Sequence, residues 1–438
     1  MSEQHPDVLI IGGGPAGSTA GTHLARRGHR VVLLEKSAHP RFHIGESLLP
    51  MNLPILDRLG VLDQVRKIGV PKLGADFTHG DDPADYATYH FKRALGGSGD
   101  HAFEVRREDF DALLFDNCKA AGVDAREHQT VTNVEFNPDG DGRHCLTSVD
   151  ENGRALTWRP RFVVDASGRD ALVASKQRSK IKNARHATAA LFAHFEGVAR
   201  RPGSDAGNIS VYWFEHGWIW MIPLQGDTMS VGAVCRPGYL KTRRGSSDEF
   251  LMQTLAQCPG ALPRMRDAKQ LSPVRAAGNY SYRSRKLAGD GYMLLGDAYA
   301  FIDPVFSSGV YLAMHGAEQA VTPIDTWLSG NQRRFSQQVR QYERQMRRGL
   351  ATYSWFIYRF TSPAMRNLFR NPRNVMQVED AVVSMLAGDV FGNPKIRRRL
   401  VLFRMIYGVS WLLTLSESWR ARRRRLSDAR LAFNTETL

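Results

Sequence analysis

Two glycine-containing turns, far apart in the chain, carry side chains that could bind a large polar ligand. The second of them reads Gly-Asp-Ala-Tyr-Ala-Phe-Ile-Asp-Pro-Val-Phe-Ser-Ser-Gly over residues 296–309 and lies between the apolar run Tyr292–Leu295 and a helical pattern over Val310–Ala320. An aspartate at the end of a buried strand, here Asp297, can accept hydrogen bonds from sugar hydroxyl groups. The backbone N–H groups of residues 307–309 would begin a helix and face an anion or an electron-rich edge. This turn therefore predicts one half of a ligand site.

The first turn supplies the other half. Residues 12–17 read Gly-Gly-Gly-Pro-Ala-Gly and fit G-x-G-x-x-G at Gly12, Gly14 and Gly17, directly after the apolar run 7–11. In this pattern the first glycine permits the turn, the second lets the backbone approach a pyrophosphate, and the third packs the helix on the strand. The second strand, Val31–Leu34, ends at Glu35, where a carboxylate accepts the ribose hydroxyls of an adenosine. The spacing predicts a dinucleotide site.

The elements that would position these turns alternate between α and β patterns. After the first strand–helix–strand unit, residues 74–91 and 186–236 have the polarity and aromatic content of strands, and the apolar run 162–164 ends at Asp165. From Val310 onward the pattern is helical. We therefore predict a mixed α/β fold, with a Rossmann-like dinucleotide domain, an inserted antiparallel sheet and a helical C-terminal region.

The predicted domain boundaries follow these changes of pattern. Residues 1–320 form the dinucleotide-binding domain, and a substrate-binding sheet is interleaved with it at about 74–100 and 186–285. Residues 321–438 form the helical C-terminal region.

Composition limits the class of protein. The chain has 438 residues, of which 42% are hydrophobic, which fits a globular protein with a large core. Its four cysteines, Cys118, Cys145, Cys235 and Cys258, have no CxxC pair and no metal-ligand spacing, so we predict no metal site and a reducing environment. The first strand begins within a few residues of Met1 without a signal-peptide pattern. We therefore expect a cytoplasmic protein.

Positive charge gathers near the C-terminus. The chain has a net charge of +15, and residues 395–430 alone contain eleven lysines and arginines against Glu417 and Asp428, a net +9. Within this segment, Leu400–Leu415 is apolar apart from Arg404 but falls short of the roughly 20 residues that a membrane span needs. We interpret it as an amphipathic helix flanked by arginines. It is either a basic tail packed on the core or a docking surface for an acidic protein or an anionic membrane. Nucleic acid is disfavoured because no nucleic-acid-binding fold accompanies the charge.

Taken together, the motifs resemble the FAD-binding fold of the aromatic-hydroxylase type over about residues 5–320. The resemblance rests on residues 12–17 with Glu35, on Val105-x-Arg107-x-x-Phe110-Asp111, on Asp165-Ala166-Ser167-Gly168 and on Gly296-Asp297. It implies FAD, with Glu35 on the adenosine ribose, Arg107 near the pyrophosphate and Asp297 on the ribityl chain. The cofactor-binding residues that it implies are Gly12, Gly14, Pro15, Ala16, Gly17, Glu35, Lys36, Glu46, Ser47, Arg107, Asp165, Gly296, Asp297 and Pro304.

Four further features resemble the flavin-dependent halogenases. Residues 218–223 read Trp-Ile-Trp-Met-Ile-Pro and reproduce the family signature W-x-W-x-I-P without a mismatch. Lys72, within Pro71–Ala75, stands where the family keeps its essential lysine. The loop Phe301–Val310 resembles the family's halide site, and residues 45–47 have its Gly-Glu-Ser form.

This resemblance implies a halogenation that uses FADH₂ and O₂. A flavin hydroperoxide would be attacked by chloride or bromide, held at Ser308 and Gly309, to give hypohalous acid. Lys72 would relay the oxidised halogen to a phenolic or heteroaromatic substrate, and burial would lower the pKa of its amine so that the nucleophilic neutral form is present. Trp218 and Trp220 would act by bulk and keep the substrate from the flavin.

The implied partners are a separate flavin reductase and, as in members that act on small tethered groups, an acidic acyl or peptidyl carrier protein. A separate reductase agrees with the absence of a second dinucleotide fingerprint, since Gly96–Gly99 follows no strand and opens no helix. Three alternatives stay open: a flavin monooxygenase that hydroxylates an aromatic substrate, a reductase of isoprenoid chains similar to geranylgeranyl reductase, and a flavoprotein scaffold without catalysis. Product mass separates the first of these from halogenation.

Overall fold

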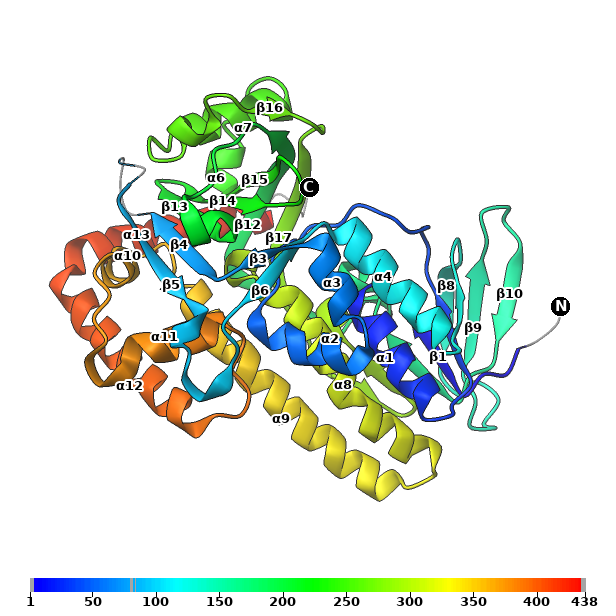
Figure 1. The fold of residues 1–438 in the computed structure, drawn as a ribbon. Helices are drawn as coiled ribbons and strands as arrows, with labels where there is room; N and C mark the ends of the chain where they lie inside the picture. Colours follow the sequence, from blue (N-terminus) through cyan, green and yellow to red (C-terminus); the bar gives the residue numbers. More distant parts are fainter. Residues whose placement is uncertain (1–3, 79–81, 83, 435–438) are drawn as a thin grey trace.

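The computed structural model describes residues 4–78, 82 and 84–434. They form a mixed α/β fold in which a parallel sheet, a large antiparallel sheet and a group of C-terminal helices lie next to one another (Figure 1). In Figure 1 the parallel sheet and its helices lie on the right, the antiparallel sheet at the top and the C-terminal helices on the left.

The parallel sheet carries the first glycine turn. Its strand order is β18-β19-β11-β1-β2-β7, and all neighbours are parallel except β18 and β19. The strands are β1 (Val8–Ile11), β2 (Val31–Leu34), β7 (Asp124–Arg126), β11 (Phe162–Asp165), β18 (Ala288–Gly289) and β19 (Tyr292–Leu294). The central strands are short, apolar and wholly buried, as expected for a sheet covered on both faces. Helices α1 (Pro15–Arg26), α4 (Arg107–Ala120) and α8 (Ser308–Leu328) pack together beside it.

The antiparallel sheet has the order β20-β17-β12-β15-β14-β13-β4-β5, with β16 paired to β12. Its strands are β4 (Gly74–Thr78), β5 (Tyr86–His90), β12 (Lys180–Glu196), β13 (Ile209–Phe214), β14 (Gly217–Pro223), β15 (Thr228–Cys235), β16 (Lys269–Gln270), β17 (Arg275–Ser284) and β20 (Ala300–Phe301). Strand β14 contains the two tryptophans, and every residue of it is buried. Helix α7 (Ser247–Ala256) packs against β12 and β15.

Two smaller sheets complete the β structure of the described chain. Strands β3 (Gly69–Lys72) and β6 (Ala102–Val105) form an antiparallel ribbon in which Lys72 lies opposite Ala102. Strands β8 (Thr130–Glu135), β9 (Cys145–Val149) and β10 (Ala155–Trp158) form a meander at the outer end of the molecule (Figure 1). The ribbon positions the lysine that the sequence singles out.

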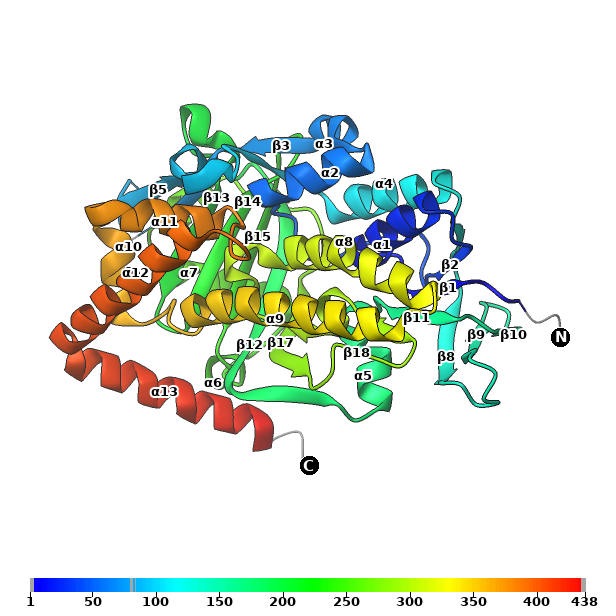
Figure 2. The same cartoon turned by 90° about the horizontal axis from the view of Figure 1, so that it is seen from below.

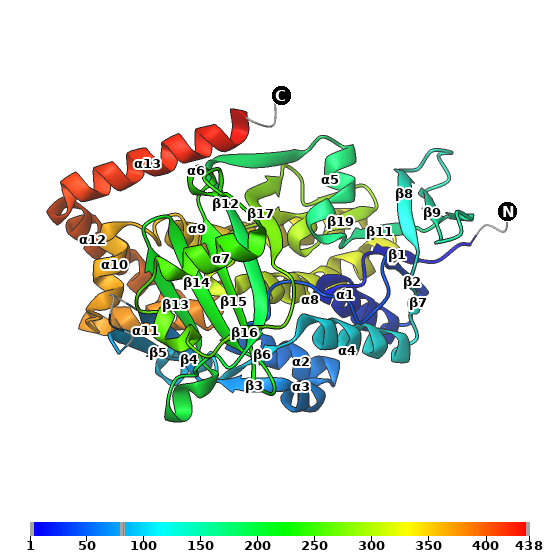
Figure 3. The same ribbon diagram turned by 90° about the horizontal axis from the view of Figure 1, so that it is seen from above.

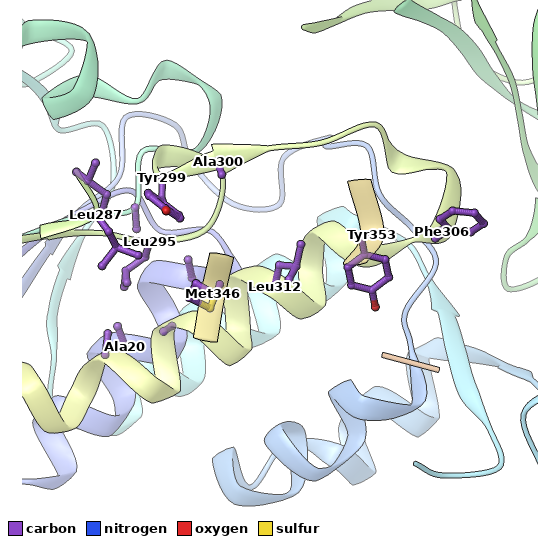
Figure 4. Packing of buried hydrophobic residues seen from close by; sticks show 14 of the residues in the cluster. Ala20, Leu287, Leu295, Tyr299, Ala300, Phe306, Leu312, Met346 and Tyr353 are labelled. Carbon is purple, nitrogen blue, oxygen red and sulfur yellow. The ribbon is translucent and has the colours of Figure 1, made fainter. Parts of the chain in front are cut away.

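A shared apolar core joins the C-terminal helices to the rest. Helix α9 (Gln332–Ile357) runs alongside α8 (Figure 2), and Met346 and Tyr353 of α9 lie near Leu312 of α8 in the packing view (Figure 4). The predicted boundary at residue 320 falls inside α8, which runs without a break from Ser308 to Leu328. The division of the chain at that residue stays a prediction.

The last helices close one side of the molecule. They are α10 (Pro363–Arg370), α11 (Val378–Leu386), α12 (Pro394–Leu413) and α13 (Leu415–Asn434), and α13 lies across β12 and α6 (Pro237–Leu240) (Figure 3). Among the described helices none is long and apolar enough on its own to cross a membrane. The pair formed by α12 and residues 415–424 reaches the required length and composition, but its two parts are bent by 98°.

Helix α12 differs from the amphipathic helix that the sequence predicts. It buries Leu400, Phe403 and Tyr407, but its outer face is also apolar. Met405 is 58% exposed and Leu413 is 83% exposed, and Val401, Val409 and Leu412 lie on the same face. An exposed apolar surface of this kind, next to arginines, is typical of an interaction site.

Candidate active site

A cavity of about 600 Å³ lies between the two glycine turns. It receives residues from the ends of β1 and β2, from the loop 41–47, from β14 and from the N-terminus of α8. Of the residues predicted for the site, those in its wall are Gly12, Gly14, Pro15, Ala16, Glu35, Lys36, Glu46, Ser47, Arg107, Trp218, Trp220, Asp297, Pro304 and Gly309. The structure therefore brings together segments that are nearly 300 residues apart in the sequence.

The three glycines of the first turn are required for different reasons. A Cβ on Gly12 would lie 2.5 Å from the carbonyl oxygen of Ala166, and a Cβ on Gly17 would lie 1.9 Å from the carbonyl oxygen of Gly12. These two positions exclude a side chain because protein already fills the space. At Gly14 a Cβ would meet only the guanidinium of Arg41, at 3.7 Å, so this position is open on the cavity side. The second glycine leaves room for a ligand, as its place in the fingerprint predicts.

Glu35 is held at the end of β2 by three donors. Its Oε2 accepts a hydrogen bond from the backbone N–H of Gly13 at 2.7 Å, and its Oε1 accepts one from the backbone N–H of Ser37 at 3.0 Å. Arg41 adds an ion pair at 3.3 Å. Each carboxylate oxygen has two lone pairs, so Glu35 keeps acceptor capacity for ribose hydroxyls. Sequence reasoning missed Arg41, because no spacing rule connects it to Glu35.

Arg107 is fixed by a second carboxylate. It donates two hydrogen bonds to Asp111, at 2.8 and 2.9 Å, and a third at 2.7 Å to the carbonyl oxygen of Ile44. The charge of Arg107, together with burial, lowers the pKa of His43 to about 4, so the imidazole is neutral at pH 7. Bidentate pairs of this kind orient a guanidinium firmly. Arg107 is thus a preset cation at the cavity wall.

Asp297 faces the cavity from the second turn. Burial raises the pKa of its carboxyl to about 6, and Arg169 and Arg107 oppose the shift. Arg169 lines the same cavity and was not predicted from the sequence. A hydroxyl donor from a ligand would stabilise the charged form of Asp297 in place of the water lost on burial.

Asp165, Gly296 and Ser308 lie behind the cavity wall. Asp165 is fully buried and accepts hydrogen bonds from the N–H and hydroxyl of Ser167 and from the N–H of Val173, so it holds the turn after β11. Gly296 has φ = +55°, the left-handed conformation that glycine adopts without strain. Ser308 begins α8 and is buried, whereas its neighbour Gly309 reaches the cavity. These residues shape the site from the second layer of protein.

Lys72 also does not line the cavity, but it contacts one residue of the cavity wall, Ser47. Its Nζ donates hydrogen bonds to the hydroxyl of Ser47, at 2.7 Å, and to the carbonyl oxygen of Leu48, at 3.1 Å. The side chain is 1% exposed, and the carboxylate of Glu104 lies 3.8 Å away. Burial lowers the pKa of Lys72 while Glu104 opposes the change, and burial raises the pKa of Glu104 to about 7. The sequence gives no signal for Glu104, because the β3–β6 pairing creates this contact.

The two tryptophans stand side by side on the cavity wall. Trp218 and Trp220 have ring centroids 5.7 Å apart, and the indole N–H of Trp220 donates to the hydroxyl of Ser230 at 3.2 Å. Alternate residues of a strand share one face, which explains why both rings point the same way. Near them, Glu46 and the imidazole of His194 form a hydrogen bond, with 2.8 Å between Oε1 and Nε2. The sequence did not predict this contact. Lys36 pairs with Asp170 at 2.6 Å.

Comparison with known proteins accounts for this arrangement. The family model described as FAD binding domain matches residues 5–349. A tryptophan 2-halogenase of Chondromyces crocatus is 37% identical over 331 residues, which cover 74% of this chain and 62% of that protein. The 1H-pyrrole-2-carbonyl-[peptidyl-carrier protein] chlorinase of Pseudomonas fluorescens Pf-5 is 28% identical over 421 residues, which cover 90% of this chain and 92% of the relative.

Solved structures agree with these sequence matches. A flavoprotein/dehydrogenase from Cytophaga hutchinsonii superposes with a TM-score of 0.85 at 28% identity, covering 93% of this chain and 99% of that one. The myxobacterial chondrochloren halogenase CndH superposes with a TM-score of 0.75 at 30% identity, covering 98% of this chain and 97% of the other. The chain belongs to the flavin-dependent halogenases.

The halogenase cavity fits FAD, the cofactor of this family. Gly14 leaves space for the pyrophosphate, and Arg107 offers a fixed positive charge next to it. Glu35 and Asp297 supply carboxylate acceptors in the cavity wall, one after β2 and one after β19. The residues that would hold FAD are therefore in place, and the family resemblance seen in the sequence is confirmed.

The open space at Gly14 leads to a test of the cofactor site. In the variant Gly14→Leu the new side chain should enter the cavity and weaken FAD binding by more than about tenfold, since it removes the approach that the pyrophosphate needs. The backbone at Gly14 has φ = −76°, which leucine adopts without strain, so the fold should be retained. Flavin fluorescence titration measures the affinity, and thermal unfolding of the apoprotein checks the fold. Unchanged FAD affinity in a folded variant would contradict this assignment.

Proposed function

We propose that this halogenase-family protein halogenates an aromatic substrate and that Lys72 delivers the oxidised halogen. The observation that carries the proposal is a buried amine of lowered pKa that donates a hydrogen bond to Ser47, a residue in the wall of a cavity that fits FAD. When bound, reduced FAD would supply, together with O₂, the oxidising chemistry that converts a halide to hypohalous acid. The remaining steps depend on side chains of this chain.

The N-terminus of α8 supports a halide position. Ser308 and Gly309 form the first turn of a helix of 21 residues, and Gly309 lies in the cavity wall. A helix N-terminus carries a partial positive charge and favours anions. Halide would therefore be held where Gly309, at the start of α8, lines the cavity.

Lys72 supports the transfer step through its protonation state. Its neutral amine can hydrogen-bond hypohalous acid or attack the halogen, and the ammonium form cannot act as a nucleophile. Burial shifts the equilibrium toward the amine. Trp218 and Trp220 would occupy the space next to the cofactor and keep an aromatic substrate at a distance from it.

The names of two relatives support an aromatic substrate, one of them carried by a protein. The substrates they state are tryptophan and a pyrrole-2-carbonyl group on a peptidyl carrier protein. The second relative matches over nearly its whole length, whereas this chain spans only 62% of the first. We therefore favour a carrier-tethered aromatic acyl group, delivered to an enzyme that receives reduced FAD from a separate flavin reductase.

The outer surface of α12 and α13 is the proposed docking surface for an acidic carrier. It combines the exposed apolar side chains of α12 with Trp419, which is 46% exposed, and with the exposed arginines Arg422 and Arg423. Opposite charges on the two proteins would speed the encounter of the enzyme with the carrier. The apolar face of α12 would then add contact area in the complex.

The cellular location is proposed on the state of the cysteines. Among the described residues Cys118, Cys145, Cys235 and Cys258 form no disulfide bond, which fits a reducing compartment such as the cytoplasm.

The role of Lys72 is testable with the variant Lys72→Met, which keeps the buried volume and removes the amine. We expect flavin reduction and reoxidation to continue while halogenated product is lost, because the oxidant is still made but is not delivered. Mass spectrometry with its halogen isotope pattern measures the product. Lys67→Met, which removes an exposed lysine from the preceding helix, is the matched control and should retain product. Undiminished halogenation by Lys72→Met would remove the proposed role.

The pair formed by Lys72 and Glu104 predicts a change in pH dependence. Charged Glu104 raises the pKa of Lys72, so the variant Glu104→Gln should lower it further. Since activity rises as the amine loses its proton, the acid limb of the rate profile should move to lower pH. Below about pH 7 Glu104 is already protonated and uncharged. In that range Glu104→Gln should therefore have the same activity as the unaltered protein. A profile of kcat against pH decides, and an unchanged or oppositely shifted acid limb would contradict the coupling.

Docking of a carrier predicts a salt-dependent rate. Reversing Arg422 and Arg423 to glutamate should lower kcat/KM for carrier-tethered substrate by about tenfold at low salt and have little effect at high salt. The control reversal of Arg333 and Arg334, exposed at the start of α9, should have no such effect. If tethered and free substrates respond alike, the surface does not bind a carrier. Binding to anionic vesicles in its place would assign the surface to a membrane.

A further inference from the structure

A pair of buried ionisable side chains joins the cavity wall to the large antiparallel sheet. Oε1 of Glu46 lies 2.8 Å from Nε2 of His194. Glu46 is 1% exposed and lines the cavity, and its second oxygen, Oε2, is buried without a hydrogen-bond partner among residues 4–78, 82 and 84–434. A buried carboxylate oxygen without a partner is costly. A molecule bound in the cavity can supply the missing partner to Oε2.

His194, on β12, extends this pair away from the cavity. It is not one of the described residues that line the cavity, yet its side chain is 11% exposed. Phe42 packs against the imidazole, with ring centroids 5.7 Å apart, and the backbone N–H of His194 donates to the hydroxyl of Ser272 at 3.1 Å. An imidazole can take up a proton at one ring nitrogen and release one at the other. The pair therefore offers a proton a path from solvent to the cavity wall.

Halogenation with a halide ion consumes a proton. In the balanced reaction, an aromatic C–H, a halide ion, O₂, FADH₂ and one proton give the aryl halide, FAD and two molecules of water. The halide brings a negative charge, whereas the halogenated product is neutral with respect to it. One proton must therefore be delivered in each turnover, in addition to those that the reduced cofactor carries.

Other ionisable side chains in the cavity wall are less suited to this delivery. The charge of Arg107, together with burial, lowers the pKa of His43 to about 4, so this ring carries no proton to donate at pH 7. Glu35 accepts hydrogen bonds from two backbone N–H groups and forms an ion pair with Arg41. Glu46 differs from both, because one of its oxygens is unpartnered and the other contacts an imidazole.

We propose that Glu46 and His194 form a proton relay for halide oxidation. As the bond between halogen and oxygen forms, an O–O bond derived from O₂ breaks, and its electron pair goes to the second oxygen atom. That atom takes the proton from Oε2 of Glu46. The carboxylate then accepts a proton at Oε1 from Nε2 of His194, and solvent protonates the ring again. A turn of the carboxyl group brings the new proton to the cavity side.

This inference rests on one part of the proposed function, the oxidation of a halide with reduced FAD and O₂, and does not depend on a carrier protein. Glu46 would contact the reacting atoms, whereas His194 would act through Glu46.

The hydrogen bond of the relay can be tested by proton NMR on the cofactor-free protein. The ring N–H of His194 should give a downfield resonance, because a hydrogen bond to a carboxylate is short and strong. His194→Gln should remove this resonance, which assigns it, and Glu46→Gln should shift it upfield. The matched control is Asp325→Asn, which changes the partner of His29, 2.8 Å away in a second histidine–carboxylate pair, and should leave the resonance in place. A resonance that Glu46→Gln does not move would contradict the pairing.

Proton delivery can be tested on the FAD-loaded protein with bromide, reduced FAD, O₂ and monochlorodimedone as a trap for hypobromous acid. In His194→Gln the amide can still donate to Glu46 but cannot relay a proton. The ratio of trapped bromine to released hydrogen peroxide should therefore fall at least about tenfold, since peroxide release consumes no additional proton. FAD affinity should stay the same, and His29→Gln should keep the ratio of the unaltered protein.

Chemical rescue separates proton transfer from a structural role. His194→Ala should lose the same ratio and regain it in part when imidazole is added, whereas His29→Ala should not respond. An unchanged ratio in His194→Gln, or a loss in His194→Ala that imidazole does not relieve, would overturn the relay while leaving the proposed function intact. If the unaltered protein oxidises no bromide, the proposed function fails, and the relay fails with it.

Discussion

The site depends on one short run of backbone hydrogen bonds between β6 and the loop before α2 (Leu53–Leu59). The N–H of Leu48 donates to Phe103 at 3.0 Å, and the N–H of Val105 donates to Glu46 at 2.8 Å. The other edge of β6 pairs with β3, so this strand joins the loop that forms the cavity wall to the strand that carries Lys72. The next residues of the chain begin α4 with Arg107. One strand of four residues thus sets the position of the amine relative to the cavity.

The buried charged groups of this region shift one another's pKa values. Lys72 and Glu104 are both almost fully buried, and each opposes the pKa shift that burial imposes on the other. Arg107 in turn keeps His43 neutral. Charges in a low-dielectric interior interact strongly, and leaving one without its partner is costly. Burial of Lys72 lowers the pKa of its amine and so favours the neutral form, which is the form that the proposed halogen transfer would need.

The C-terminal helices do more than cover the sheet. Phe360, just after α9, packs against Trp213 and Trp218 of the antiparallel sheet, and α10 and α13 form an outer groove with the end of β13. The helices therefore cover the tryptophan side of the antiparallel sheet and form one wall of the outer groove. The outer face of α12 is apolar and exposed, and it is the surface that we propose as a docking site.

The sequence by itself determined the fold class, a dinucleotide site and most of the cavity wall, because glycine turns and strand-end carboxylates act through the local backbone. FAD as the cofactor followed from the family resemblance of these motifs. The three glycines, Glu35 and Asp297 were all found from spacing. Only the tertiary structure decided which of the predicted residues face the cavity. Asp165 accepts hydrogen bonds within the turn that follows β11 and does not line the cavity. Lys72 lies behind Ser47 and donates a hydrogen bond to its hydroxyl. It also decided the contacts of Glu104, Arg41 and His194. These depend on strand register and helix packing between distant segments, for which a pattern along the chain carries no signal.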